Sequence, residues 1–413
     1  MFLLALLALA VLAPLLYLPG ALVARALRGA PPPDPLERIY QHTALGALIA
    51  GWLAFTLGQL GIFSAWLYLL LLAAVCAAAA LVHKTRTRYA HTAQGTGWVS
   101  GRTAPSLTLP FLLTLGIAFL LVARPFEVVI GVRDAGVYAN AGFAMARTGA
   151  LVQRDALVAQ IAADQRSADA ALAASAAQAE TNFLGVQPRQ RNIATRLRAA
   201  GFYINHGDLE EGRVTPQGLH LFTAWVGLLT ALLGLQGGLL APALMGLLGV
   251  WSVGMLARRL GGPWAGLLAA LFLALNAAQV WFSRYSTTET TAQFLTFAGL
   301  YFFAALTNDQ RPTTNDETPV GGVDGGRSSF VVRHKEFAAL LSGLAFGQLA
   351  LARIDFFLVL APLALYLLYV AVARRWSRAH TWLAAGLSAL LAHAATQFTG
   401  LARAYFFDTL FAR

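Results

Sequence analysis

The 413-residue chain is 58% hydrophobic and 12% charged, with a net charge of +11. A soluble domain carries about twice that fraction of charged residues, so the composition excludes an ordinary soluble protein and indicates a membrane protein. In a membrane protein, the positive charge is better explained by basic loops that fix topology and contact anionic lipid than by nucleic-acid binding. A single cysteine, Cys76, excludes an intramolecular disulfide.

Apolar segments of roughly the length needed to cross a bilayer recur along the chain. The first one lacks a basic start and a small-residue cleavage site, so we expect it to be retained rather than removed as a signal peptide. The segments predicted to cross are 2–23, 43–63, 65–82, 107–122, 239–256, 263–280, 294–306, 337–351, 356–372 and 382–395.

Basic residues in short loops predict the orientation, because such loops stay in the cytoplasm. The loops predicted to be cytoplasmic contain Arg25, Arg28 and Arg38; Lys84, Arg86 and Arg88; Arg258 and Arg259; Arg327, Arg333 and Lys335; and Arg374, Arg375 and Arg378. The sides alternate only if the apolar segment 219–235 does not cross. We therefore expect that segment to be an interfacial or half-inserted helix at the outer face; a true eleventh span with an unusual topology is the alternative.

The predicted fold class is all-α: a polytopic membrane protein of about ten transmembrane helices, with its N-terminus outside and a long outer loop that carries juxtamembrane helices. Within that loop we expect a helix at 135–147 that ends before Gly149, and one Ala- and Gln-rich surface helix at 154–180. The predicted parts are additional N-terminal helices with a basic cytoplasmic loop (1–105), a core (106–306) with its first outer loop (124–217), a disordered cytoplasmic loop rich in Pro, Thr, Asn and Gly (307–335), and C-terminal helices (336–413).

Residues able to carry chemistry gather on the outer side in this topology. Charged groups near membrane depth are costly, and they tend to face the protein interior or a water-filled cavity. The candidates are Arg133, Asp134, Tyr138, Tyr203, His206, Asp208, Glu210, Glu211, Arg284, Tyr285, Glu289, Arg353 and Asp355.

Asp134 is the best candidate for a general base, or for an acidic group that anchors a sugar or a metal. As a base it would accept the proton of an acceptor hydroxyl during displacement at an anomeric carbon. It also precedes the expected helix 135–147, so a capping role is the alternative, and the two roles are compatible because a cap fixes the carboxylate.

The other candidates have simpler alternatives. Arg284 is suited to donate to a phosphate oxygen and Glu289 to bind the acceptor or the sugar; anchoring at the interface by Trp281, Arg284 and Tyr285 is the less favoured alternative. Arg353 with Asp355 could be a phosphate clamp or a satisfied pair. His206, and more so Glu210 and Glu211, are weaker candidates, because loop residues of these types are usually only solvated.

The sequence contains no P-loop, no dinucleotide fingerprint and no His/Cys spacing typical of a metal site. We therefore predict no metal ligands and no certain cofactor, with a divalent cation left as an open alternative.

Several segments together resemble the membrane glycosyltransferases of the GT-C superfamily, the bacterial relatives of protein mannosyltransferases and aminoarabinose transferases. The resemblance covers roughly 107–355. It is carried by Arg133-Asp134 and Tyr138, Gly142 to Gly149, Thr215-Pro216-Gln217 with His220, the runs 241–250, 257–263 and 269–280, Arg284 and Glu289.

The resemblance implies that a sugar is taken from a polyprenyl-phosphate carrier and moved to a lipid, glycan or protein acceptor outside a bacterial cytoplasmic membrane. It places the catalytic acids at Asp134 and Glu289 and an outer-face helix at 219–235. Beside the resemblance, we expect a substrate-binding role for Arg133, Tyr138, His206, Arg284, Arg353 and Asp355. The chain departs from the mannosyltransferases in having no second acid directly after Asp134, which leaves acceptor and metal dependence open.

Two other classes of function remain as alternatives. A transporter or flippase of a carrier lipid would need charged residues at the bilayer midplane in broken helices, whereas the charges here lie at the ends of spans. A non-catalytic scaffold for envelope assembly is the third class.

Overall fold

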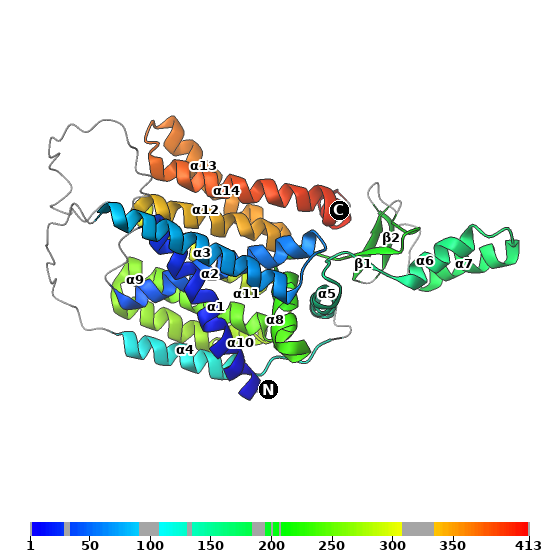
Figure 1. Ribbon diagram of the computed structural model, residues 1–413, viewed down its shortest axis with the longest axis horizontal. Helices are drawn as coiled ribbons and strands as arrows, with labels where there is room; N and C mark the ends of the chain where they lie inside the picture. The colour runs from blue at the N-terminus through cyan, green and yellow to red at the C-terminus, as the bar shows by residue number, and fades with distance from the viewer. Residues whose placement is uncertain are drawn as a thin grey trace.

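The computed structural model describes residues 2–28, 34–90, 107–129, 134–183, 195–199, 201–205, 208–307 and 334–411. Long helices lie side by side in one bundle, and a small sheet with two further helices projects from one end of it (Figure 1). The prediction of a predominantly helical, apolar protein is confirmed. The expected disordered loop, apart from its ends, lies outside the described residues.

The bundle is built from helices that overlap the predicted apolar segments, with ends that differ by up to eight residues. They are α1 (Phe2–Arg28), α2 (Pro35–Gln59), α3 (Ala65–Ala90), α4 (Thr108–Val122), α9 (Ala241–Leu275), α11 (Glu289–Thr307), α12 (His334–Ala352), α13 (Phe357–Val372) and α14 (Arg378–Thr396). Among the described residues, the helices that are long and apolar enough to cross a membrane by length and composition are Phe2–Leu27, Ala65–Thr85, Leu221–Gly238, Ala241–Leu275 and Ile354–Val372.

The long helix α9 contains a sharp turn at Gly262, where φ is 88°. A Cβ atom placed on Gly254 would lie 2.9 Å from the Cβ of Ala270, sixteen residues further on. Such a contact requires the chain to reverse, so α9 is two antiparallel helical segments. This agrees with the separate segments 239–256 and 263–280 expected from the sequence. The short α10 (Ala277–Phe282) follows, capped by the Asn276 side chain, which accepts from the Gln279 N–H.

Helix α8 (Leu221–Gly238) runs steeply across one end of the bundle, next to α5 (Asp134–Thr148), rather than along it (Figure 1). It packs against α5, α2, α9, α1, α12 and α3. Its residues from Leu221 to Leu229 are all buried, and the chain bends at Gly234, where φ is 78°. A helix that touches so many neighbours at one end suits the expected half-inserted arrangement, which stays a prediction.

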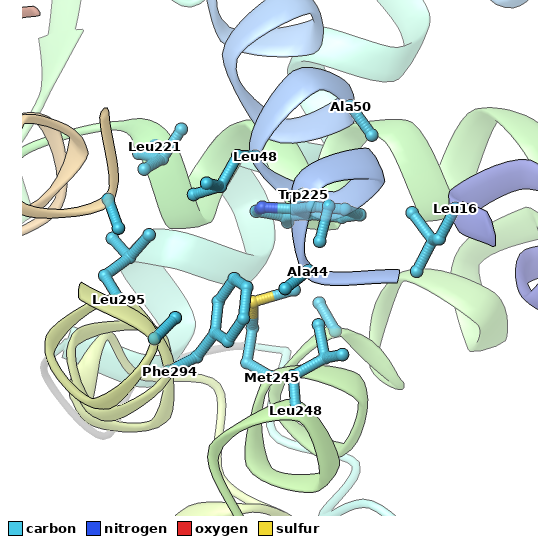
Figure 2. Close-up of a cluster of buried hydrophobic side chains, with 14 of the residues drawn as sticks. Leu16, Ala44, Leu48, Ala50, Leu221, Trp225, Met245, Leu248, Phe294 and Leu295 are labelled. Atoms are coloured by element: carbon cyan, nitrogen blue, oxygen red, sulfur yellow. The ribbon is translucent and has the colours of Figure 1, made fainter. Parts of the chain in front are cut away.

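The core lies where α8 meets the bundle (Figure 2). Trp225 of α8 lies among Ala44 and Leu48 of α2, Met245 and Leu248 of α9, and Phe294 and Leu295 of α11. A Cβ atom on Gly51 of α2 would lie 2.5 Å from the Trp225 Nε1 atom, so only glycine admits the indole there. Helix α2 is therefore central to the bundle.

Glycines also bring α1 and α2 into backbone contact. A Cβ atom on Gly46 would lie 1.6 Å from the Leu16 carbonyl oxygen, and one on Gly20 would lie 1.8 Å from the His42 carbonyl oxygen. Small residues allow this close approach between helices in a membrane.

Replacing Gly46 with alanine should therefore lower the free energy of unfolding by about 1–3 kcal/mol, because the added methyl group forces the two backbones apart. Thermal unfolding in detergent measures the effect. Gly116→Ala is the matched control, since a Cβ atom there meets nothing within 4 Å. Equal melting temperatures for both variants would show that α1 and α2 are not packed as described.

At the opposite end of the bundle from α8, two ion pairs join α2 to α9. Arg258 pairs with Asp34, and Arg259 pairs with Glu37. Arg259 also lies over the Tyr301 ring at 4.1 Å, and the Tyr301 hydroxyl donates to Glu37 at 2.6 Å. These charges are mutually satisfied, so we interpret them as structural.

A small sheet, which the sequence did not predict, projects from the other end. Its strand order is β1-β4-β3-β2, with all neighbours antiparallel. The strands are β1 (Gln153–Arg154), β2 (Thr195–Ala199), β3 (Phe202–Asn205) and β4 (Arg213–Pro216). A hydrophobic cluster of Val158, Ala162, Ile204 and Leu209 packs one helix against it.

The single surface helix expected at 154–180 is wrong in detail. The chain forms α6 (Ala156–Gln165) and α7 (Ala170–Phe183), each begun by an aspartate. Asp155 accepts from the Leu157 and Val158 N–H groups, and Asp169 accepts from those of Ala171 and Leu172. Asp169 caps the start of a second helix, which could not be distinguished from the first by the alanine-rich composition. Helix α5 and the terminating Gly149, with φ of 81°, agree with the prediction.

Candidate functional site

The end of the bundle that carries α5 and α8 brings together polar groups from distant parts of the chain. They come from the start of α5, the turn between α10 and α11, the junction η2 (Ile354–Phe356) that follows α12, and the C-terminal α15 (Arg403–Phe411). Each group lies at a helix terminus, where backbone groups are open and charged side chains reach water most easily.

Arg353 joins two carboxylates at this end. Its Nε and Nη2 atoms donate to both oxygens of Asp355, at 2.8 and 2.9 Å, and its Nη1 atom donates to Glu289 Oε1 at 2.9 Å. The bidentate pair fixes the plane of the guanidinium, which in turn fixes one oxygen of Glu289. The other oxygen, Oε2, has no hydrogen-bond partner in the described structure. The arrangement therefore leaves one buried carboxylate oxygen unpaired within the group.

Asp134 lies at the start of α5, with an exposed side chain. Two tyrosines lie near enough to interact electrostatically both with Asp134 and with members of the Arg353 group. Burial raises the pKa of the Tyr138 hydroxyl, and the nearby Tyr405, Asp134 and Glu289 raise it further. Burial likewise raises the pKa of Tyr405, which also feels Asp134, Arg353 and Asp355. Both phenols therefore stay protonated and available as hydrogen-bond donors between the carboxylates.

The turn between α10 and α11 is rich in hydroxyl groups. Ser286, Thr287, Thr290 and Thr291 are each at most 5% exposed, and none of these hydroxyls has a partner in the described structure. Buried polar groups are normally paired, so these hydroxyls are free to hydrogen-bond to water or to a ligand. Ser283, just before this turn, lies close to α9: a Cβ atom on Gly246 would be 2.0 Å from Ser283 Oγ.

The predicted site residues do not all join this group. Asp134, Tyr138, Glu289, Arg353 and Asp355 lie together, as the previous contacts show. Arg284 instead binds the end of α4: its Nε atom donates to the Arg124 carbonyl oxygen at 2.6 Å, and its guanidinium lies 4.5 Å from the Phe126 ring centroid. Arg133 and His206 lie outside the described residues.

The weaker candidates on the sheet form surface pairs. Arg213 contacts Asp208 and Glu211, each at 3.2 Å, and Arg166 contacts Glu210 at 3.6 Å. Tyr203 is buried in β3, at 2% exposure. These positions serve the folding of the projecting part.

The sequence analysis missed Thr288 and Tyr405. The Thr288 hydroxyl donates a side-chain hydrogen bond to Tyr138 and accepts one from Arg353 Nη1 at 3.4 Å. The run of hydroxyl residues before Glu289 could have indicated Thr288 in the sequence. No local sequence feature indicates Tyr405, because only the folding of the C-terminal helix brings it back to α5.

His220, at the start of α8, is fully buried beside the site. The Pro216 carbonyl can only accept, so Nε2 of His220 carries the proton and donates to it at 3.0 Å, while Nδ1 accepts from Gln397 Nε2 at 3.2 Å. Burial lowers the pKa of His220 from 6.5 to about 4. The ring is therefore held neutral in one tautomer.

This depressed pKa predicts a stability that depends on pH. Between about pH 6.5 and pH 4 the unfolded chain binds a proton at His220 that the folded chain does not. Stability is fully present above that window and falls through it by about 2–4 kcal/mol. As the pH is lowered through this window, the melting temperature in detergent should drop for wild type and drop less for His220→Gln. The control variant His83→Gln should behave like wild type. An unchanged drop in His220→Gln would assign the acid sensitivity to other groups.

Among the described residues, no three His, Cys, Asp or Glu side chains come together in a way that would hold a metal ion. No protein-family model, curated protein or solved structure matches this chain. The function must therefore be argued from the site itself.

Proposed function

We propose that this protein is a membrane glycosyltransferase that moves a sugar from a polyprenyl-phosphate carrier to an acceptor hydroxyl. The reaction would occur at the outer face of a bacterial cytoplasmic membrane, in a chain that crosses it about ten times. The acceptor would be a lipid, a glycan or a protein.

The observation that carries this proposal is the pairing of a restrained carboxylate with a free one at one end of an apolar bundle. Glu289 is held by Arg353, and Asp134 is exposed nearby. Two phenols lie near these charges, and buried hydroxyls without partners in the described structure flank Glu289 along the chain. Neutral hydroxyls with ordered carboxylate oxygens match the alternating donors and acceptors of a sugar ring.

In the proposed reaction, Asp134 accepts the proton of the acceptor hydroxyl as its oxygen attacks the anomeric carbon. The bond between that carbon and the carrier phosphate oxygen breaks, and the electron pair leaves with the phosphate. Displacement by one base inverts the anomeric carbon, which differs from hydrolysis by two carboxylates that flank a water. Glu289 accepts hydrogen bonds from sugar hydroxyls through its carboxylate, whose side chain is 40% exposed.

The leaving phosphate needs positive charge at headgroup depth. Arg353 is already committed to two carboxylates. Arg284, which lies at the outer end of α4, therefore remains the better candidate for the phosphate, together with Arg133. Arginine suits this role because its planar donors match phosphate oxygens.

A proteoliposome assay tests the proposal. Purified protein is reconstituted with tritium-labelled polyprenyl-phosphate glucose, galactose or mannose, each in turn, and with an envelope extract as acceptor. We expect the label to leave the carrier for one of the sugars, with free polyprenyl phosphate formed in equal amount. Labelled lipid that changes leaflet without losing its sugar would instead establish the flippase alternative and reject transfer.

A further inference from the structure

An apolar cavity of about 600 Å³ lies between α1, α2, α4 and α9, away from the polar site. Its lining includes Leu9, Tyr17, Leu112, Gly116 and Trp251. Leu9 and Leu112 are 45% and 44% exposed, so the cavity opens sideways toward the bilayer. In that environment its contents are drawn from lipid.

A second, smaller cavity continues the first toward the end of the bundle that carries the site. The two share Leu9, Leu12, Phe119, Leu244 and Leu247 in their linings, and the second also reaches Ala123 and Leu240. Together they form one groove, which follows α4 from Leu112 to Ala123. Eleven residues of helix rise about 16 Å, close to the depth of one leaflet in a hydrocarbon core of about 30 Å.

The end of this groove at Ala123 is positively charged. Arg124 directly follows Ala123 and is exposed, and Arg284 lies against the Arg124 carbonyl oxygen. Arginines at headgroup depth attract anionic lipid. The groove thus has an apolar channel as deep as one leaflet and a cationic rim.

We infer that the groove is a binding site for one anionic phospholipid of the outer leaflet, with an acyl chain in the groove and its phosphate at Arg124. The depth favours an acyl chain, because an acyl chain ends within its own leaflet, whereas a long isoprenoid chain extends well beyond it. This inference does not depend on the proposed transfer reaction. It gives the N-terminal helices α1 and α2 a role as walls of a lipid site.

Gly116 offers the means to test it. Gly116 lines the groove and a Cβ atom there meets nothing within 4 Å, so a larger side chain starts in open space at the groove. Gly116→Trp fills the groove, and Gly116→Leu fills it in part. Leu113→Trp is the matched control: Leu113 lies on the same helix, is 60% exposed and does not line either cavity.

Native mass spectrometry of protein taken from nanodiscs of equal phosphatidylglycerol and phosphatidylcholine gives the readout. Wild type and Leu113→Trp should retain one phosphatidylglycerol, Gly116→Trp should lose it at least tenfold, and Gly116→Leu should lie between them. Arg124→Gln should reduce the preference for phosphatidylglycerol severalfold while keeping a bound lipid.

Melting temperatures of the variants show whether each is folded, and a misfolded Gly116→Trp leaves Gly116→Leu to decide. Retention of phosphatidylglycerol by a folded Gly116→Trp at the wild-type level would overturn the site. A polyprenyl phosphate retained from native membranes, lost in Gly116→Trp and not replaceable by phosphatidylglycerol, would overturn the identity of the occupant. Neither result bears on whether Asp134 catalyses sugar transfer.

Discussion

The Asp134→Asn variant should transfer sugar at least a hundredfold more slowly than wild type, because a general base contributes about 10²–10⁴ to the rate. Asparagine has the same shape and caps a helix as well as aspartate does, so the start of α5 should be preserved. The exposed position of the Asp134 side chain makes a large change in stability unexpected. The measurement is the initial rate of hexose loss from polyprenyl-phosphate hexose in proteoliposomes.

Asp155→Asn is the matched control. Asp155 also starts a helix on the outer part of the chain and accepts hydrogen bonds from two N–H groups, but it belongs to α6. Its variant should keep the wild-type rate. If Asp134→Asn also keeps it, Asp134 is not the base. A loss in both variants would point to disturbance of the projecting part instead.

Helices of the bundle were predictable because the bilayer imposes a simple rule. Every backbone group in lipid must be paired within its own segment, so long apolar runs become helices. The reversal at Gly262 also had a local signal, since the sequence Gly261-Gly262-Pro263 breaks a helix between two apolar runs. Helix ends such as Gly149 follow from the same short-range chemistry.

The small sheet was not predictable by the same route. Its strands are two to five residues long and pair across gaps of up to sixty residues, as Gln153 does with Val214. Such strands carry too few residues to show an alternating pattern, and their pairing depends on the folded chain. The break between α6 and α7 was hidden because alanine favours a helix through the position where Asp169 starts a new one.

The site was predictable in part. The proximity of Asp134, Glu289, Arg353 and Asp355 could be anticipated because each adjoins the end of an apolar run. Sequence could not show that Arg353 holds Glu289 from sixty-four residues away, or that Tyr405 returns to α5. It also suggested that Arg284 would join the acids, whereas Arg284 lies against α4. The direction of a side chain at a helix end is set by tertiary packing. A prediction of membrane spans contains no information about that packing.

Loss of the Arg353 guanidinium should be the most damaging change at a residue that does not contact the reacting atoms. In Arg353→Leu, Glu289 and Asp355 lose their shared partner and face each other's charge. Both acids are 40% exposed, so water offsets part of the cost, and we expect the free energy of unfolding to fall by about 1–3 kcal/mol. Because Glu289 also loses its orientation, sugar transfer should fall about a hundredfold.

Two further variants distinguish positioning from general destabilisation. Arg353→Lys keeps the charge but cannot make the bidentate contact with Asp355 while reaching Glu289, so it should recover most of the stability and little of the rate. Arg213→Leu removes an arginine that also contacts two carboxylates, at 3.2 Å each, on the exposed sheet. It should change stability by less than about 1 kcal/mol and leave the rate unchanged. A full rate in Arg353→Lys would reject an orienting role for the guanidinium, because charge alone would then suffice to hold Glu289 in place.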